Sequence, residues 1–321
     1  MTSPGRSTPE FFAVAFVVAS CGAGVPTPTG PTTSIENFHT EMELTTLSMH
    51  VRSGQAELRC DVVGDGVGDS PTLIFLHAGV ADRRSWSAVT RELGRTHRTV
   101  AYDRRGFGET TYEPESYSHA DDLLAVINAL GGEKVILIGN SQGGRIAIDF
   151  ALAHPERVIA MVLVGPALSG EAEPTSLSGP ASRLAAVIDA ADEAGDLEQV
   201  NRLEAHFWLD GPSSTEGRVG GSARALFLDM NQRALSARSP GEERPPRSAV
   251  DRLGELAMPV HVVVGELDLQ FVNERGQRIA QGVRRGTLTE FRGAAHLPQL
   301  EQPDAFIREI RQFLSRVDRE E

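Results

Sequence analysis

The sequence predicts an α/β fold, a mostly parallel twisted sheet flanked by helices and interrupted by a helical insertion. Short runs rich in Val, Ile and Leu alternate with amphipathic stretches of helical spacing over most of the 321 residues. Continuous apolar runs of this kind indicate strands buried on both faces, as in a parallel sheet covered by helices. One long stretch late in the chain lacks strand patterns, and it predicts the insertion.

The composition excludes several classes of protein. Hydrophobic residues make up 40% of the chain and charged residues 23%, which is typical of a globule with a sizeable core and not of collagen, coiled coils or disordered chains. The net charge of −13 repels phosphate backbones, so no nucleic-acid partner is expected. Two cysteines, Cys21 and Cys60, are too few for a metal cluster or a disulfide framework. No metal or organic cofactor is expected.

Residues 1–45 differ in character from the rest of the chain. Nine apolar residues at 11–19 suit the core of a secretory signal and are too few to span a bilayer. The run ends in Val-Ala-Ser-Cys-Gly, which resembles the lipobox of bacterial lipoproteins and implies lipidation of Cys21. We therefore expect a flexible tether and an extracytoplasmic enzyme anchored to the cell membrane. The alternative is a cytoplasmic enzyme whose translation starts at Met42 or Met49.

The body of the chain begins at residue 46 and alternates strands with helices. Two early runs, 47–51 and 57–63, are typical of an opening antiparallel pair. Further buried strands are expected at 73–76, 99–102, 134–139, 159–164, 260–264 and 287–291. Helical spacing of apolar residues appears at 118–130, 142–153, 274–284 and 303–316.

Residues 169–254 interrupt this alternation. They contain no strand pattern but several helical stretches, expected at 181–194, 197–208 and 222–237. The core domain is thus predicted in two parts, 46–168 and 255–321, with the helical insertion between them. A disordered loop is an alternative only for 239–248, where Gly, Pro and Ser punctuate the chain.

One motif predicts a catalytic nucleophile. The segment Gly139-Asn140-Ser141-Gln142-Gly143 follows an apolar run and precedes a helical stretch, which is the strand–turn–helix context of the G-x-S-x-G motif. A serine on so sharp a turn adopts a strained backbone, and side chains at the flanking glycines would collide with neighbouring backbone. Free N–H groups at the start of the helix favour negative charge on the serine oxygen. Ser141 is the predicted nucleophile.

A serine nucleophile needs a general base, and nine histidines compete for the role. His296 lies in a Gly-Ala-Ala-His-Leu-Pro loop just after the last predicted strand. Loops at the carboxyl edge of a parallel sheet are where site residues gather. The other histidines are interpreted as solvent-facing or packed, so His296 is the predicted base.

The base in turn needs a carboxylate that fixes its tautomer and stabilises its charged form. Asp268 follows a buried strand and is the predicted partner, with Glu266 as its rival two residues earlier. Asp103 also lies at a strand end, but Arg104 and Arg105 beside it indicate a structural ion pair. The order serine, aspartate, histidine along the chain is the one expected for this arrangement.

The turn that begins at His77 can supply a backbone N–H to the developing oxyanion. It ends the first central strand and is built from small residues. The second donor would be the N–H of Gln142, directly after the nucleophile. His77 itself is interpreted as a brace of the turn, held by hydrogen bonds.

Together these segments resemble the α/β-hydrolase superfamily over residues 46–317. The landmarks are 77–79, 103–108, 139–144, 265–268 and 293–302. The resemblance implies an α/β-hydrolase fold with a helical cap and a triad of Ser141, Asp268 and His296. It also implies oxyanion donors at the N–H groups of Gly79 and Gln142.

Two groups within the superfamily are similar to this chain. The turn that carries Ser141, residues 139–144, is called the elbow here, and it is similar to the elbow of carbon–carbon bond hydrolases of ring-fission products. Those enzymes usually carry tryptophan where Leu297 stands. His296, Leu297 and the segment 301–303 are closer to the 3-oxoadipate enol-lactonase group.

The sequence therefore predicts a serine hydrolase of a small carboxylic ester or lactone that works through an acyl-enzyme. One alternative is a carbon–carbon bond hydrolase with the same triad, and another is a non-catalytic binding protein on the same fold. Phe207, Trp208 and Met230 are candidate pocket residues in the insertion. The substrate and the oligomeric state are not predicted.

Overall fold

The computed structural model describes residues 44–68, 70–132, 134–172, 174 and 176–319. The predicted signal, Cys21 and most of the tether lie outside these residues. Within them, no helix combines the length and the apolar character that crossing a bilayer requires.

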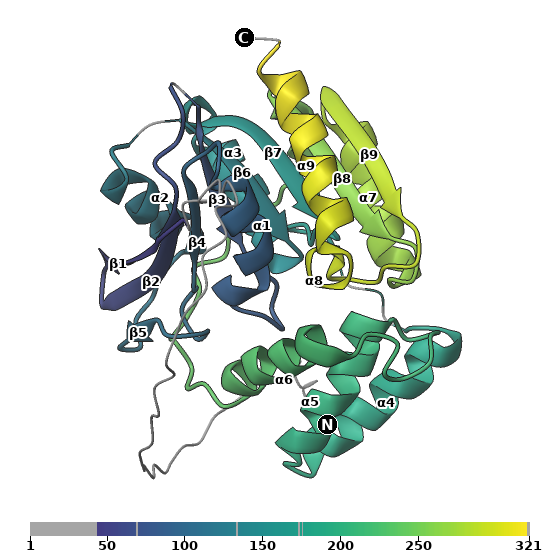
Figure 1. Cartoon of the computed structure of the whole chain (residues 1–321). Helices are drawn as coiled ribbons and strands as arrows, with labels where there is room; N and C mark the ends of the chain where they lie inside the picture. Colours follow the sequence, from purple (N-terminus) through teal and green to yellow (C-terminus); the bar gives the residue numbers. More distant parts are fainter. Residues whose placement is uncertain (1–43, 69, 133, 173, 175, 320–321) are drawn as a thin grey trace, which may run out of the picture.

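A nine-stranded, mostly parallel sheet forms the centre of the molecule, as the alternating pattern predicts (Figure 1). Its strand order is β1-β2-β4-β3-β6-β7-β8-β9, and β5 pairs with β2. The antiparallel part consists of β1 (Thr46–Ser53), β2 (Ala56–Val63) and β5 (Thr111–Tyr112). The parallel strands are β3 (Thr72–Leu76), β4 (Thr99–Tyr102), β6 (Val135–Asn140), β7 (Val158–Val164), β8 (Pro259–Gly265) and β9 (Arg285–Phe291).

Helices cover both faces of this sheet. One face packs against α1 (Ser87–Leu93) and α9 (Pro303–Val317). The other packs against α2 (His119–Ala129), α3 (Gln142–Ala153) and α7 (Gln270–Gly282). Short helical turns lie at η1 (Arg83–Trp86), η2 (Pro155–Arg157), η4 (Val250–Glu255) and α8 (Pro298–Glu301).

The sequence pattern explains α9 well and leaves α1 unpredicted. In α9 the buried residues Phe306, Ile310, Phe313 and Val317 recur every three or four positions, which gives the helix one apolar face. α1 has only seven residues and follows directly on η1, so the pattern is too short to stand out.

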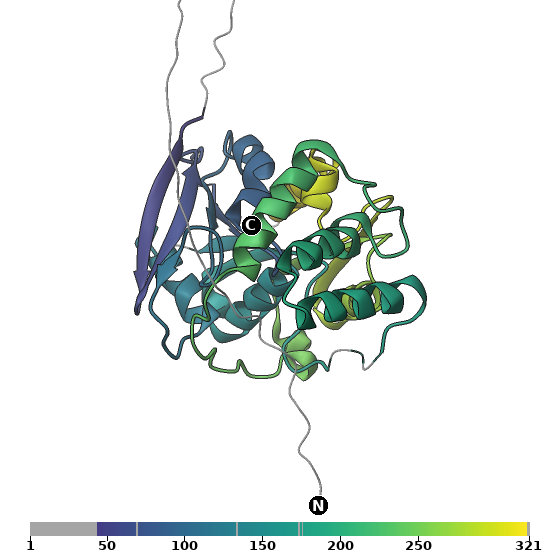
Figure 2. The ribbon, with the colours of Figure 1, turned by 90° about the horizontal axis from the view of Figure 1, so that it is seen from below.

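The insertion between β7 and β8 forms a helical cap. It consists of α4 (Gly179–Glu193), α5 (Leu197–Glu204), the π-helical turn η3 (Ala205–Asp210) and α6 (Gly221–Leu235). The cap lies across the end of the sheet where the parallel strands terminate (Figures 1 and 2). The helix expected at 197–208 thus changes hydrogen-bonding pattern after Glu204, and such π-turns are frequent at functional sites.

Residues 236–248 return from the cap to the core as an extended strap. The strap is bonded to the core backbone, because Pro240 O accepts from Glu115 N at 3.1 Å and Glu242 O accepts from Tyr117 N at 3.0 Å. A β-bridge joins Tyr117 to Glu243. The alternative of a disordered loop at 239–248 is therefore wrong, because the strap satisfies its backbone groups against the core.

Candidate active site

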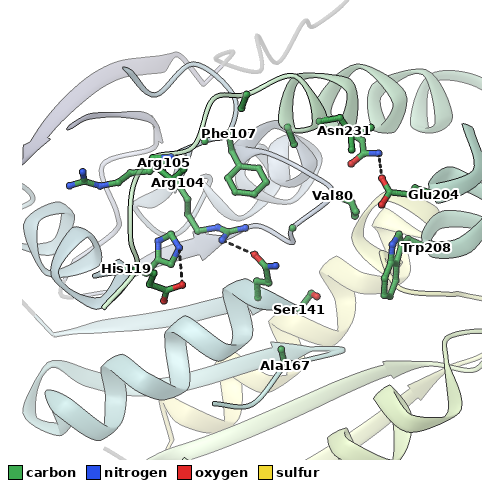
Figure 3. Close-up of a pocket in the computed structure, with 18 of the residues that line it drawn as sticks. Val80, Arg104, Arg105, Phe107, His119, Ser141, Ala167, Glu204, Trp208 and Asn231 are labelled. Atoms are coloured by element: carbon green, nitrogen blue, oxygen red, sulfur yellow. Dashed lines mark hydrogen bonds and ion pairs between the residues drawn. The ribbon is translucent and has the colours of Figure 1, made fainter. Parts of the chain in front are cut away.

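The predicted site residues meet at the carboxyl ends of the parallel strands. Ser141 directly follows β6, while Asp268 follows β8 and His296 follows β9. Ser141 and His296 both line one cavity of about 610 Å³. Figure 3 shows Ser141 on the core side of this cavity and Glu204, Trp208 and Asn231 on the cap side. Crevices at the carboxyl ends of strands are where α/β sheets bind ligands.

Ser141 occupies the strained turn that its motif predicts. Its φ of 56° makes it the single non-glycine residue with positive φ in the described part of the chain. The turn is held because Ser141 N donates to Val164 O at 2.8 Å and Ser141 O accepts from Arg145 N at 3.1 Å. Strain of this kind persists only where the surroundings enforce it, and here it places the serine at the N-terminus of α3.

The glycines of the elbow leave room for backbone. A Cβ on Gly139 would lie 2.4 Å from Gly143 O, and one on Gly143 would lie 2.2 Å from Leu76 O. Both distances are far inside van der Waals contact with atoms that cannot move aside. The two glycines therefore let β6, α3 and the end of β3 approach closely enough to form the turn.

His296 and Asp268 form a buried hydrogen-bonded pair. Nδ1 of His296 lies 2.6 Å from Oδ2 of Asp268, and their side chains are 3% and 2% exposed. The other oxygen of Asp268 accepts from Leu269 N at 2.7 Å. A histidine whose Nδ1–H is held by a carboxylate presents Nε2 as its acceptor, the form that a general base requires. No hydrogen bond joins His296 to Ser141 within the described residues.

Gly165 is a site residue that the sequence reasoning missed. It follows β7 with φ of 46°. A Cβ there would lie 3.1 Å from Nδ1 of His296 and 3.3 Å from Oδ2 of Asp268. Gly165 therefore clears the space in which the pair meets. The available signal was a glycine directly after a buried parallel strand, a position that favours close approach.

The turn after β3 lies against the start of α3, as an oxyanion hole requires. The side-chain amide of Gln142 sits over Gly79, because a Cβ on Gly79 would lie 2.9 Å from Gln142 Nε2. His77 braces this turn as predicted: its Nδ1 lies 2.7 Å from Ala78 O, and its Nε2 accepts from Arg104 N at 3.1 Å. Burial holds the pKa of His77 well below its usual value, so the brace is neutral.

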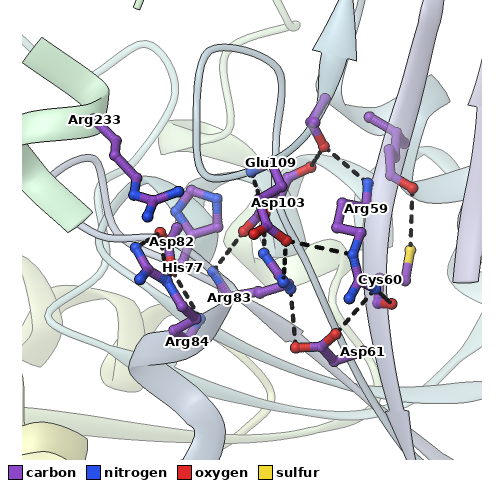
Figure 4. A network of polar contacts seen from close by, with 12 residues as sticks. Arg59, Cys60, Asp61, His77, Asp82, Arg83, Arg84, Asp103, Glu109 and Arg233 are labelled. Carbon is purple, nitrogen blue, oxygen red and sulfur yellow. Dashed lines mark hydrogen bonds and ion pairs between the residues drawn. The ribbon is translucent and has the colours of Figure 1, made fainter. Parts of the chain in front are cut away.

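The ion pair predicted for Asp103 exists with a different partner. Asp103 pairs with Arg83 and also accepts from Glu109 N at 2.8 Å (Figure 4). Arg105 instead pairs with Asp122 at 2.9 Å. The expectation that Arg104 and Arg105 supply the partner was wrong, because consecutive residues leave a strand end in different directions.

Glu266, the rival of Asp268, lies away from the histidine side chain. Its carboxylate accepts from Gly293 N at 2.8 Å and is exposed. It supports the loop that carries His296 without contacting the imidazole. Asp268, the later of the two acids along this loop, is therefore the one that contacts the imidazole, as the sequence predicts.

Only one of the three candidate pocket residues lines the cavity. Trp208 does, and its ring lies 4.7 Å from the His296 ring between centroids. Phe207 instead packs with Leu269 and Val272, and Met230 packs in a separate cap cluster that includes Leu297. Successive residues on a helical turn point to different sides, so Phe207 and Trp208 cannot share one wall.

The geometry provides the parts of nucleophilic acyl transfer. It has a hydroxyl at a helix N-terminus, an imidazole with its carboxylate partner, and Gly79 and Gln142, the predicted oxyanion donors, lining the same cavity as the serine. Such a set can attack a carbonyl, hold the oxyanion that results and move the proton to a leaving group.

The model of the alpha/beta hydrolase family matches residues 73–309. One curated relative, the 2-hydroxy-6-oxononadienedioate/2-hydroxy-6-oxononatrienedioate hydrolase of Klebsiella pneumoniae subsp. pneumoniae, is 27% identical over 84% of this chain and 95% of its own length. The 2-hydroxy-6-oxo-6-phenylhexa-2,4-dienoate hydrolase of Comamonas testosteroni is 28% identical over 77% of this chain and 88% of its own. Among solved structures, the esterase RhEst1 from Rhodococcus sp. ECU1013 is similar with a TM-score of 0.67 and 26% identity, covering 85% of this chain and 99% of that one.

Proposed function

The chain belongs to the alpha/beta hydrolase family, and from this premise we propose that it hydrolyses a carbon–carbon bond next to a ketone in a small acidic diketone. The substrate class is the one in the names of the relatives, 2-hydroxy-6-oxo-dienoates. The observation that supports hydrolysis at Ser141 is the hydrogen bond of 2.6 Å between His296 and Asp268 at the same cavity, and the relatives' substrates favour carbon–carbon cleavage there. This choice replaces the ester or lactone expected from the sequence as the first candidate.

In the proposed reaction His296 takes the proton of Ser141, whose oxygen attacks the ketone carbon at position 6. The N–H groups of Gly79 and Gln142 hold the oxyanion. Before the attack the substrate ketonises: the hydroxyl at position 2 loses its proton and carbon 5 gains one, which conjugates the new ketone at position 2 with the double bond between carbons 3 and 4. On collapse of the oxyanion the bond between carbons 5 and 6 breaks, and its electron pair delocalises through that double bond to the oxygen at position 2. His296 returns the proton taken from Ser141 to the departing dienolate. Water activated by His296 then releases the acid from Ser141.

The charge of the cavity wall supports an acidic substrate. Arg104 is buried, and among the described residues its guanidinium donates to two neutral acceptors, Gln142 Oε1 at 3.0 Å and Ala78 O at 3.1 Å, and to no carboxylate. Burial lowers the pKa of Arg104 to about 10, so it remains a cation at neutral pH. A buried cation without a carboxylate partner favours an anionic ligand, and the substrates in the relatives' names are carboxylic acids.

Ester hydrolysis is the second candidate, and two observations favour it. The solved structure that covers 85% of this chain at 26% identity is an esterase. Leu297, fully buried beside Met230 and Phe227, fills the position that carbon–carbon hydrolases usually give to tryptophan. The chemistry at Ser141 would be the same, with an alcohol as the leaving group.

One experiment separates the two candidates. The purified enzyme is given 2-hydroxy-6-oxo-6-phenylhexa-2,4-dienoate and, separately, p-nitrophenyl esters of two, four and six acyl carbons. We expect kcat/KM for release of benzoate from the dienoate to exceed the best ester by at least about tenfold. A preference for the esters would move the assignment to ester hydrolysis.

Ser141→Ala is the matched control for this experiment. We expect it to lower either activity by at least about 10³-fold with little change in melting temperature. Retained activity in a folded Ser141→Ala variant would refute the nucleophile.

A further inference from the structure

Glu204 is a buried acid whose surroundings the catalytic machinery does not explain. It ends α5 and is 8% exposed. It lines the same cavity as Ser141, on the cap side, whereas Arg104 and His119 lie on the other side in Figure 3. Trp208, one helical turn later, lies beside it.

Glu204 differs from the other buried acids that the structure describes, because each of them is paired with a basic side chain. Four pair with arginine: Asp82 with Arg84, Asp103 with Arg83, Asp122 with Arg105 and Asp210 with Arg224. The buried side chains of Glu301 and Asp268 pair with Arg218 and His296. The Glu204 carboxylate has no cation within ion-pair distance in the described part of the chain. Its one protein hydrogen bond there is from Asn231 Nδ2 to Oε2, at 2.7 Å. A buried carboxylate with a single neutral donor is unfavourable unless a further partner completes it.

Asn231 and its neighbours hold this carboxylate in place. Asn231 Nδ2 also donates to Asn201 Oδ1 at 3.1 Å, and Asn201 Nδ2 donates to Leu228 O at 2.9 Å. Both hydrogens of the Asn231 amide are thus used, which fixes its orientation between α5 and α6. The network leaves Glu204 Oε1 without a hydrogen-bond partner among the residues that the structure describes, and Glu204 lines the cavity. A polar group positioned by a network of this kind is preorganised for a ligand.

We propose that Glu204, positioned by Asn231, is a recognition point for a hydrogen-bond donor on the substrate, a protonated amine or a hydroxyl. The inference deepens the proposed function and rests on it, because it concerns the cavity in which Ser141 acts. The donor would form a hydrogen bond to Glu204 Oε1, which has no such bond within the described residues. A site built to bind a donor rejects the isosteric group that lacks one, because the buried acceptor is then left unpaired.

The test uses three alkyl fluorophosphonates that differ only in the far end of the chain: ω-amino, ω-hydroxy and methyl. Each labels Ser141 with loss of fluoride, so the rate constant of labelling reports chain binding without requiring the natural substrate. Chains of four, six and eight carbons vary the distance between the reactive phosphorus and the far end of the probe. We expect that at one length or more the amino or hydroxy probe labels at least tenfold faster than the methyl probe.

Glu204→Gln should remove this preference, because its amide oxygen can still accept from Asn231 while its NH2 group replaces the free oxygen that would accept from the probe. The matched control is Glu243→Gln, since Glu243 lines the same cavity but is paired with Arg145 at 2.9 Å. We expect the control to keep the preference within about threefold. Equal rates for all three probes at every length, or equal loss of preference in both variants, would overturn the inference.

The outcomes of the experiment distinguish a charged donor from a neutral one, and the role of Glu204 from the proposed function at Ser141. A preference for the amino probe alone identifies a cation, and a preference shared by the hydroxy probe identifies a neutral donor as sufficient. A wild-type protein that no probe labels would refute the proposed function at Ser141 rather than the role of Glu204.

Discussion

The charge of Glu204 affects the free energy of unfolding, because no cation within ion-pair distance neutralises it in the described part of the chain. Burial raises the pKa of Glu204 from 4.5 to about 6. The folded protein therefore binds this proton more tightly than the unfolded chain does, and the stability that the proton provides is lost as the pH rises through about 6. At pH 8 the ionised carboxylate destabilises the folded state by about 2 kcal/mol.

We expect Glu204→Gln to raise the free energy of unfolding by about 2 kcal/mol at pH 8 and to leave it nearly unchanged at pH 4. Urea titrations at the two pH values measure this. Glu216→Gln, an exposed acid of the cap, is the control and should stay within about 0.5 kcal/mol. A gain that is equal at both pH values would show that packing, not charge, limits stability at this position.

Single substitutions of Asp268 and Glu266 test which of the two acids is the partner of His296. Asp268→Asn should lower kcat by about 10²-fold to 10⁴-fold, because its Oδ2 fixes the tautomer of His296. Glu266→Gln should change kcat less than about threefold, because its carboxylate contacts only the backbone of Gly293. Steady-state kinetics of both variants decide, and a larger loss in Glu266→Gln would contradict the assignment.

At the scale of structural elements, an ion pair and hydrogen bonds connect the cap to the loop that carries His296. Glu301 is 1% exposed in its side chain and accepts from Ala295 N and Leu297 N on either side of His296. Arg218 of the cap pairs with Glu301 and also donates to Gly293 O at 2.8 Å. The loop that carries the base is therefore anchored to the insertion.

We expect Arg218→Met to lower the free energy of unfolding by about 3 kcal/mol, because it leaves Glu301 buried and unpaired. Burial already raises the pKa of Glu301, so loss of the arginine should raise it further and make activity fall at acidic pH where the wild type is active. The double variant with Glu301→Gln should be more stable than Arg218→Met alone in a double-mutant cycle. Additive losses would show that the two side chains do not interact.

The sequence predicts those elements whose signals are local. The elbow at Ser141 is determined by glycines within two residues of it, and the strands by continuous apolar runs. The partner of Asp103 could not be predicted, since Arg83 lies twenty residues away. The isolation of Glu204 could not be predicted either, because it depends on which cations the folded cap leaves out of reach. Local signals thus locate the candidate catalytic residues, while the charges that the cavity presents depend on long-range contacts.

For the molecule as a whole, we propose a location on the outer face of a bacterial membrane. If Cys21 is lipidated, the protein from its own host should partition into detergent and carry the mass of two or three acyl chains. Cys21→Ser should accumulate as an uncleaved precursor without that mass. Intact-mass measurement decides, and an unmodified chain starting at Met42 or Met49 would refute the anchor.

The structure gives the two alternative starts different consequences. Strand β1 begins at Thr46, where it pairs with Val63, and Leu47 pairs with Val62. A start at Met49 would remove these pairs from the edge of the sheet, whereas a start at Met42 would keep them. Met42 is therefore the start that a cytoplasmic form would need for a complete β1.

A backbone hydrogen bond joins His296 to the cap. His296 N donates to Trp208 O at 3.1 Å, across the boundary between core and cap. Any opening that carried Trp208 away from the core would break this bond, so in the proposed reaction His296 would be held for its role as base only while the cap is closed. Substrates that draw the cap shut would then raise the competent fraction of the enzyme, and their apparent dissociation constant would equal the intrinsic one divided by that fraction.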